Sequence, residues 1–161
     1  MKRIATCAVV LCFVAALAVA QEAAEKPWFD LQNCVFCKEV AAQPGLLEHM
    51  NTEYHNISSG FLSISKVDDE YLPAYEKMKA GMKKVITDMQ TTGKIPYMCQ
   101  HCSKYGEFAM AGVKMEEVET GYGIIHMAMS SDSTVVTKLQ EFAKRTDTES
   151  KKYKKEMAGK K

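Results

Sequence analysis

The feature that most constrains the fold is a pair of C-x-x-C motifs, with cysteines at 34 and 37 and again at 99 and 102. Each motif opens a stretch of chain with the same order of expected elements. The sequence holds six cysteines, and the other two, Cys7 and Cys12, fall in an apolar leader. A chain without that leader therefore keeps its four cysteines in the two motifs, with none left over.

The leader has the three parts of a secretory signal. Lys2 and Arg3 are basic, residues 4–19 form an apolar run, and residues 18–20 read Ala-Val-Ala, which is an A-x-A cleavage site. The run is shorter than the roughly 20 residues of a membrane span. The sequence therefore predicts a signal peptide over residues 1–20, export to the periplasm or the medium, and no stable membrane span after cleavage. Disulfides are permitted in such a compartment.

Composition divides the remaining chain into three parts. Residues 21–28 are predicted to be a disordered lead, residues 29–146 a single domain, and residues 147–161 a basic tail. Removing Lys2 and Arg3 from the 21 basic residues leaves 19 against 20 acidic ones. This balance argues against nucleic-acid binding and leaves an unknown protein partner open.

Hairpin signals follow each cysteine motif. Residues 51–57 and 61–67 flank Ser58-Ser59-Gly60, and residues 113–120 and 124–130 flank Gly121-Tyr122-Gly123. Short half-apolar runs around such turns are typical of β-hairpins.

Helical patterns surround the hairpins. Residues 31–42 are expected to form a first helix, and Asp68-Asp69 and Asp132 are expected to cap the helices that follow the two hairpins. The last helix is expected to fade near Arg145. Methionines 127 and 129 align with apolar positions of the first hairpin and are predicted to lie in the core.

The two stretches, residues 31–93 and 94–146, are interpreted as copies of one α-β-β-α unit. Neither copy could bury a sheet face alone, so the two hairpins should join into one antiparallel sheet of about four strands, covered by helices. The predicted fold class is therefore α+β with an internal duplication.

A metal site is the favoured chemistry for the four cysteines. Two C-x-x-C pairs supply four thiolates, which suit tetrahedral Zn²⁺, and soft thiolates also suit copper. The predicted ligands are Cys34, Cys37, Cys99 and Cys102, and His101, which lies inside the second motif, is a further candidate ligand or thiolate partner. Since 61 residues separate Cys37 from Cys99, tertiary packing would have to assemble the site.

Two alternatives stay open. The cysteines could form structural disulfides that stabilise an interaction domain. They could instead exchange disulfides, with Cys99 as an exposed nucleophile and Cys102 as the resolving thiol, because a C-x-x-C motif at a helix start favours a thiolate. The sequence carries no G-x-S-x-G or H-E-x-x-H motif, so an enzymatic function would rest on these thiols alone.

The order of C-x-x-C motif, hairpin and capped helix, followed by the same again, resembles small exported bacterial proteins that have no assigned activity. The resemblance implies an envelope protein and assigns no functional residues. The sequence thus predicts an exported, non-catalytic domain that binds zinc, or else copper, through paired C-x-x-C motifs.

Overall fold

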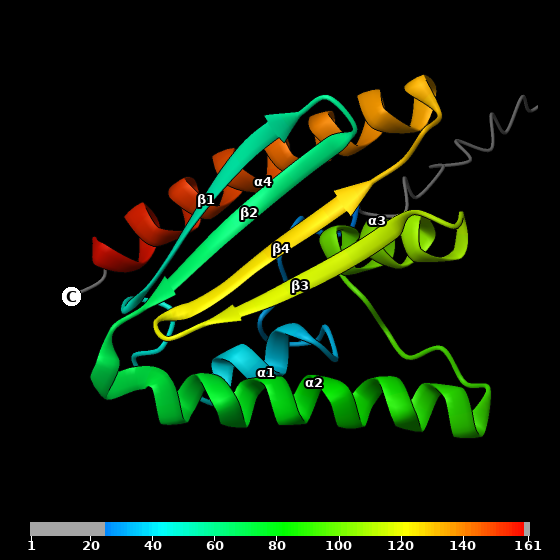
Figure 1. Ribbon diagram of the computed structural model, residues 1–161. Helices are drawn as coiled ribbons and strands as arrows, with labels where there is room; N and C mark the ends of the chain where they lie inside the picture. Colours follow the sequence, from blue (N-terminus) through cyan, green and yellow to red (C-terminus); the bar gives the residue numbers. More distant parts are fainter. Residues whose placement is uncertain (1–24, 160–161) are drawn as a thin grey trace, which may run out of the picture.

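The fold is a four-stranded antiparallel sheet with helices packed against it (Figure 1). A computed structural model describes residues 25–159. The predicted signal peptide and the first residues of the predicted lead lie outside that range. The strands are β1 (Met50–Ile57), β2 (Gly60–Val67), β3 (Lys114–Thr120) and β4 (Gly123–Met129). Their order in the sheet is β1-β2-β4-β3, which confirms the predicted α+β class.

Both predicted hairpins are confirmed, and each has a two-residue loop. Ile57 pairs with Gly60 in the first, and Thr120 pairs with Gly123 in the second. Two-residue loops fix the register of the strands that they connect. The turns thereby determine which apolar side chains of each hairpin point toward the helices.

The two hairpins join through β2 and β4, where Ile64 lies opposite Ile125. Because side chains alternate between the faces of a sheet, Phe61 and Ala128 point to one face and the isoleucines to the other. Phe61 and Ala128 are buried and belong to the main hydrophobic core. Joining equivalent strands places the two hairpins in one continuous sheet, as expected.

Methionines 127 and 129 do not belong to the core, and the prediction that placed them there was wrong. Both are half-buried and lie outside the hydrophobic clusters of buried residues. Met127 pairs with Leu62, and both belong to the set that alternates away from Phe61 and Ala128. The two methionines do share one face of the sheet, but the helices cover the other face.

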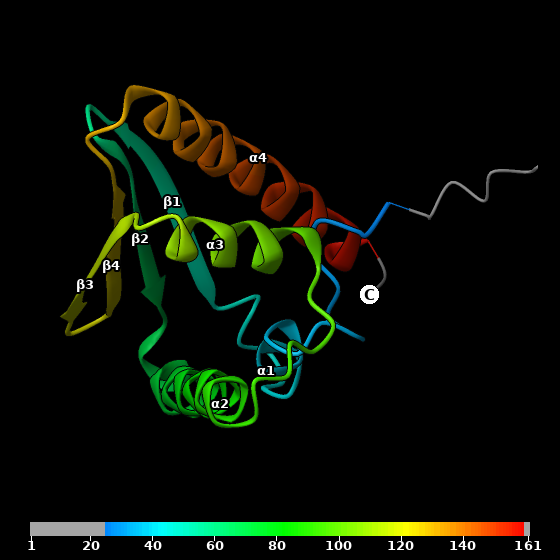
Figure 2. The same ribbon diagram turned by 90° about the vertical axis from the view of Figure 1, so that its right-hand side faces the viewer.

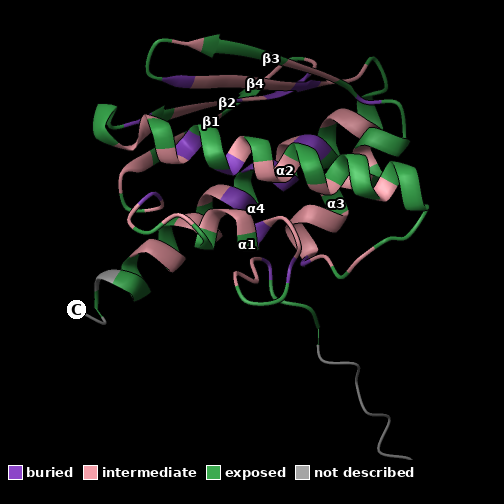
Figure 3. Cartoon of the chain, turned by 90° about the horizontal axis from the view of Figure 1, so that it is seen from below, coloured by how far each residue is buried: buried purple, intermediate pink, exposed green. Residues whose placement is uncertain are grey.

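The helices lie on one side of the sheet (Figure 2). They are α1 (Cys37–Ala41), α2 (Leu72–Thr92), α3 (Gln100–Met110) and α4 (Ser133–Ala158), with a short 3-10 turn, Asp69–Tyr71, before α2. Buried residues concentrate between the helices and the sheet (Figure 3). Among residues 25–159, no helix combines the length and apolar character that crossing a membrane requires.

Two apolar clusters hold the layers together. In the first, Leu139 and Phe142 of α4 pack against Phe61 of β2 and against Trp28. In the second, Tyr75 and Met78 of α2 pack against Leu46 and Val67. Trp28 is only 7% exposed, so the predicted disordered lead, residues 21–28, extends too far along the chain. Burying so large an aromatic side chain against apolar partners is favourable and holds this residue in the fold.

The first helix is shorter than predicted. The pattern over residues 31–42 indicated one helix, whereas α1 covers only Cys37–Ala41. Residues 31–36 form turns instead, and the Asp30 carboxylate accepts hydrogen bonds from the backbone N–H groups of Gln32 and Asn33. Such local bonds from an aspartate compete with helix formation.

The last helix is longer than predicted. The helix was expected to fade near Arg145 into a basic tail, but α4 continues to Ala158. No glycine or proline interrupts the chain before Gly159, and Asp147 pairs with Lys151 one turn later at 2.6 Å. In addition, Lys154 Nζ donates to the backbone carbonyl of Met50 at 2.5 Å, which holds this half of α4 against β1.

The duplication itself stays a prediction, because the two units differ in detail. Asp132 accepts hydrogen bonds from Thr134 N and Val135 N and caps α4 as expected. The matching residue, Asp68, caps nothing with its side chain and instead contacts His49 Nδ1 at 2.8 Å. Equivalent positions in the sequence therefore do different work in the fold.

Replacing Asp132 with Ala should lower the free energy of unfolding by about 1 kcal/mol, because two N–H groups of the first turn of α4 lose their acceptor. Urea denaturation of the purified variant measures this change. Ser131→Ala is the matched control, because Ser131 is exposed and makes no side-chain hydrogen bond within residues 25–159. An equal loss in both variants would contradict the capping role.

Candidate metal centre

The first cysteine pair lies in the turns that lead into α1. Cys34 precedes the helix and Cys37 is its first residue. Cys34 N donates to Asp30 O at 3.1 Å, and Lys38 N donates to Cys34 O at 3.0 Å. These bonds close two consecutive turns, which direct both sulfur atoms to the same side of the loop.

The second pair lies at the start of α3. Cys99 is the extended residue that precedes the helix, and its carbonyl accepts from Ser103 N at 3.0 Å. The next two N–H groups, of Gln100 and His101, donate to the carbonyls of Pro27 and Trp28, each at 3.1 Å. The first turn of a helix leaves such donors without partners inside the helix. Here the chain's own N-terminal segment satisfies them.

One backbone hydrogen bond links the two cysteine loops directly. Val35 N, between the first two cysteines, donates to Tyr97 O at 3.1 Å, just before the second pair. The four sulfur atoms then lie within 4.8 Å of one another. Cys37 Sγ is 3.6 Å from Cys99 Sγ and 4.0 Å from Cys102 Sγ. The structure thus brings together all four cysteines that the sequence singled out.

None of these four cysteines is in a disulfide. A disulfide requires a sulfur–sulfur distance near 2.05 Å. The measured distances instead suit a shared ion, because a tetrahedral zinc with Zn–S bonds of about 2.3 Å would hold its sulfur atoms about 3.8 Å apart. The chemistry and the spacing of the donor set both fit a metal.

The cluster is buried unevenly. Cys34 and Cys99 are 0% exposed and Cys37 is 7% exposed, whereas Cys102 is half-buried. The cysteines form a hydrophobic cluster of their own, with Leu31, Phe36 and Met98 packed against it. Cys99 is fully buried, so the prediction that its thiol is exposed was wrong, and attack on a disulfide would first require access to the sulfur.

Hydrogen bonding within the cluster separates the thiols electrostatically. The thiols of Cys102 and Cys37 donate toward Cys99, which lowers its pKa well below the ordinary value for a cysteine. The same contacts with Cys37 and Cys99, together with burial, raise the pKa of Cys102. Four thiolates at these distances would repel one another strongly without a cation among them. A divalent ion would remove that repulsion.

His101 lies beside the cluster and is not one of its members. Its ring packs among Phe29, Trp28 and Phe142, with centroids 5.0 to 5.9 Å apart. Its Nδ1 is 3.9 Å from Cys102 Sγ, and burial lowers the pKa of the imidazole to about 4. The neutral ring serves as an aromatic wall of the site, so the structure does not support it as a metal ligand.

A half-buried histidine lies on the helix-facing side of the sheet. His126 Nε2 is 2.5 Å from the Tyr105 hydroxyl, and its ring packs 6.0 Å from that of Phe61. Burial lowers the pKa of His126 below its ordinary value of 6.5.

This burial predicts a pH dependence of stability. Because the folded-state pKa of His126 lies below 6.5, the unfolded chain binds more protons at this residue than the folded chain, and the free energy of unfolding decreases as the pH is lowered through this range. Wild-type protein should therefore lose free energy of unfolding between about pH 7.5 and 5.5, and His126→Gln should lose less. Urea titrations at both pH values measure the difference. His55→Gln, at an exposed strand position, should change the slope less, and equal slopes in the three proteins would contradict the argument.

Sequence reasoning missed the backbone partners of the site and its neighbouring cavity. The carbonyls of Pro27, Trp28 and Tyr97 carry no side-chain signal, so only the folded chain reveals them. The residues of α4 beyond Arg145 were assigned to a tail, although the absence of a helix breaker before Gly159 was a usable signal.

The chain was also compared with known proteins. It matches no protein family model, no curated protein and no solved structure.

Proposed function

We propose that the protein is an exported, non-catalytic domain that holds one Zn²⁺ ion through Cys34, Cys37, Cys99 and Cys102. The observation that carries the proposal is the convergence of four sulfur atoms to within 4.8 Å, from two loops with no disulfide. Secretory features of the leader support export to the periplasm or the medium.

A structural role suits this donor set better than a catalytic one. Four protein ligands complete the coordination of zinc, whereas catalytic zinc keeps one position for water or substrate. Copper is the competing ion, because thiolates also bind Cu(I). The ion would connect the two cysteine loops, which a backbone hydrogen bond from Val35 N to Tyr97 O already joins.

Metal and thiol analysis of the mature chain, residues 21–161, tests the proposal. Protein purified without reductant should contain about one zinc per chain. All four thiols should resist alkylation until a chelator is added, and mass spectrometry should then count four adducts. Two disulfides with no metal would overturn the proposal, and copper at the same stoichiometry would overturn the choice of zinc alone.

A further inference from the structure

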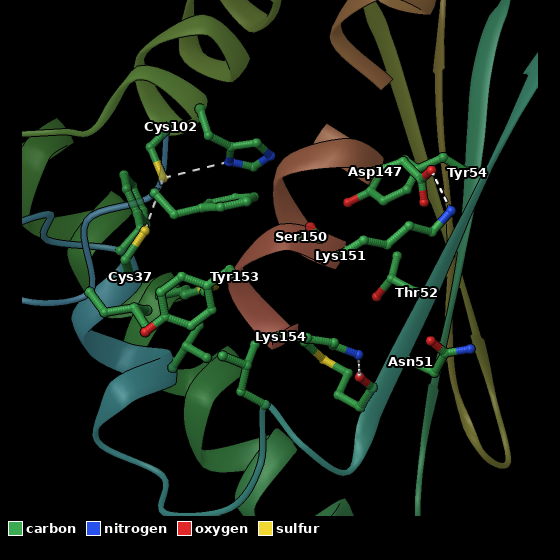
Figure 4. A pocket seen from close by; sticks show the side chains of 18 residues that line it. Cys37, Asn51, Thr52, Tyr54, Cys102, Asp147, Ser150, Lys151, Tyr153 and Lys154 are labelled. Atoms are coloured by element: carbon green, nitrogen blue, oxygen red, sulfur yellow. Dashed lines mark hydrogen bonds and ion pairs between the residues drawn. The ribbon is translucent and has the colours of Figure 1, made fainter. Parts of the chain in front are cut away.

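A cavity of about 260 Å³ lies between α1, the start of β1 and the C-terminal half of α4 (Figure 4). Its volume equals that of about nine liquid water molecules. Small-molecule sites in proteins usually begin near 300 Å³, so the cavity suits a compact ligand. This feature is separate from metal binding, although Cys37 and Cys102 line one end of it.

One wall of the cavity is apolar. It is formed by the side chains of Phe29, Leu31, Phe36, Val40, Met50 and Met82, which come from the N-terminal segment, α1, β1 and α2. The free energy decreases when an apolar group displaces the water next to such side chains, because apolar surface is removed from water.

The opposite wall is polar and comes from one face of α4. Ser150 and Lys154 are four residues apart and line the cavity, and Asp147 and Lys151 join them at helical spacing. Earlier turns of the same helix bury Leu139 and Phe142 against the sheet. The inward face of α4 therefore changes from apolar to polar where it meets the cavity.

This wall carries one positive charge without an acidic partner. Lys151 is paired with Asp147 at 2.6 Å. Lys154 makes no ion pair within residues 25–159, and its only side-chain hydrogen bond there is to the carbonyl of Met50. Burial lowers the pKa of Lys154. The Ser150 hydroxyl also has no hydrogen-bond partner among the described residues, so two donors face the cavity beside an apolar wall.

We propose that this cavity binds a small amphipathic monoanion, namely a carboxylate with a short apolar body. The apolar body would lie against the wall formed by Phe36, Val40 and Met82. The carboxylate would accept hydrogen bonds from Lys154 Nζ and the Ser150 hydroxyl. An anion would balance the charge of the unpaired Lys154 ammonium, and a hydrogen bond between charged groups is stronger than one between neutral groups.

Octanoate is a suitable probe, with octanol as its uncharged analogue. Calorimetric titration of the mature, metal-loaded chain should show saturable binding of octanoate. Lys154→Gln keeps a donor and removes the charge, so it should weaken octanoate binding about tenfold, the change expected for one charge-assisted hydrogen bond. Octanol binding should change by less than about twofold, since it does not use the charge. Lys154→Arg should retain octanoate binding.

Lys152→Gln is the matched control, because Lys152 is exposed on α4 and does not line the cavity. It should leave both affinities unchanged. Methyl resonances of labelled methionine locate the ligand: octanoate should shift Met50 and Met82, and each signal is assigned by substitution with leucine. Absence of saturable binding, equal losses for octanoate and octanol in Lys154→Gln, or shifts at Met127 and Met129 instead would each overturn the proposal.

Discussion

Replacing Cys34 with Ser should release the metal and lower the free energy of unfolding by more than about 4 kcal/mol. Cys34 is fully buried, so the serine hydroxyl would neither replace the thiolate as a zinc ligand nor reach water. Apparent zinc-binding free energies in small structural sites are about 10–16 kcal/mol, which is comparable to the stability of a whole domain. Metal content per chain and urea denaturation measure the two effects.

The location of the damage is also predictable. The two large apolar clusters contain none of the four cysteines, so the sheet and its helices should persist longer than the loops. Hydrogen exchange should therefore accelerate first at Val35, whose N–H donates to Tyr97 O across the two cysteine loops, and at Ser103, whose N–H donates to Cys99 O within the second loop.

Two controls separate metal loss from ordinary destabilisation. Met98→Leu alters a neighbour of the cluster with little change in volume, so it should keep the metal and cost less than about 1.5 kcal/mol. Chelation of the wild type should reproduce most of the loss seen in Cys34→Ser. A Cys34→Ser variant that kept one metal per chain and full stability would show that the cluster is not the binding site.

Replacing Gly60 with Ala should lower the free energy of unfolding by at least about 3 kcal/mol. Gly60 begins β2 with φ of +150°, a conformation that residues with a Cβ rarely adopt. A Cβ there would lie 2.1 Å from the Ala128 carbonyl oxygen on β4. The backbone must move to relieve that contact, and the backbone concerned belongs to β2 and β4, the strand pair that joins the two hairpins.

A glycine-to-alanine substitution in α3 should change the free energy of unfolding in the opposite direction. Gly106 lies inside the helix, and no described atom outside its own turn of helix lies within 4 Å of the Cβ that an alanine would add. Gly106→Ala should therefore raise the free energy of unfolding by about 0.5–1 kcal/mol, because alanine loses less backbone entropy on folding. Thermal and urea denaturation of both variants test the pair. A stable Gly60→Ala protein would mean that β2 and β4 can separate at that end without cost.

The sequence predicted the sheet well because its signals are local. Alternating runs around Ser58-Ser59 and Gly121-Tyr122 specify hairpins without reference to the rest of the chain. Joining the hairpins followed from the need to bury one face. The face that is buried, however, depends on where the helices pack, and this is why Met127 and Met129 were placed in the wrong layer.

The members of the cysteine cluster were predictable from the sequence, but the contacts that assemble it were not. Outside the predicted leader the sequence has four cysteines and no fifth, which indicated that they act together, and the fold brings their sulfur atoms together. Their surroundings depend on main-chain contacts of Trp28 and Tyr97, which have no pattern in the sequence. His101 was a candidate ligand because it lies between two cysteines in the sequence, yet its ring is oriented by packing against aromatic side chains.

The segment between α2 and α3 has a consequence for how the molecule could be divided. Residues 93–95 are exposed, with Ile95 74% accessible, and this segment is where the chain passes from one hairpin unit to the other. Each side of it retains one hairpin and two of the four thiols. A chain cleaved there should consequently behave as two complementing fragments, which stay together through β2, β4 and the proposed shared ion and separate more readily once a chelator is added.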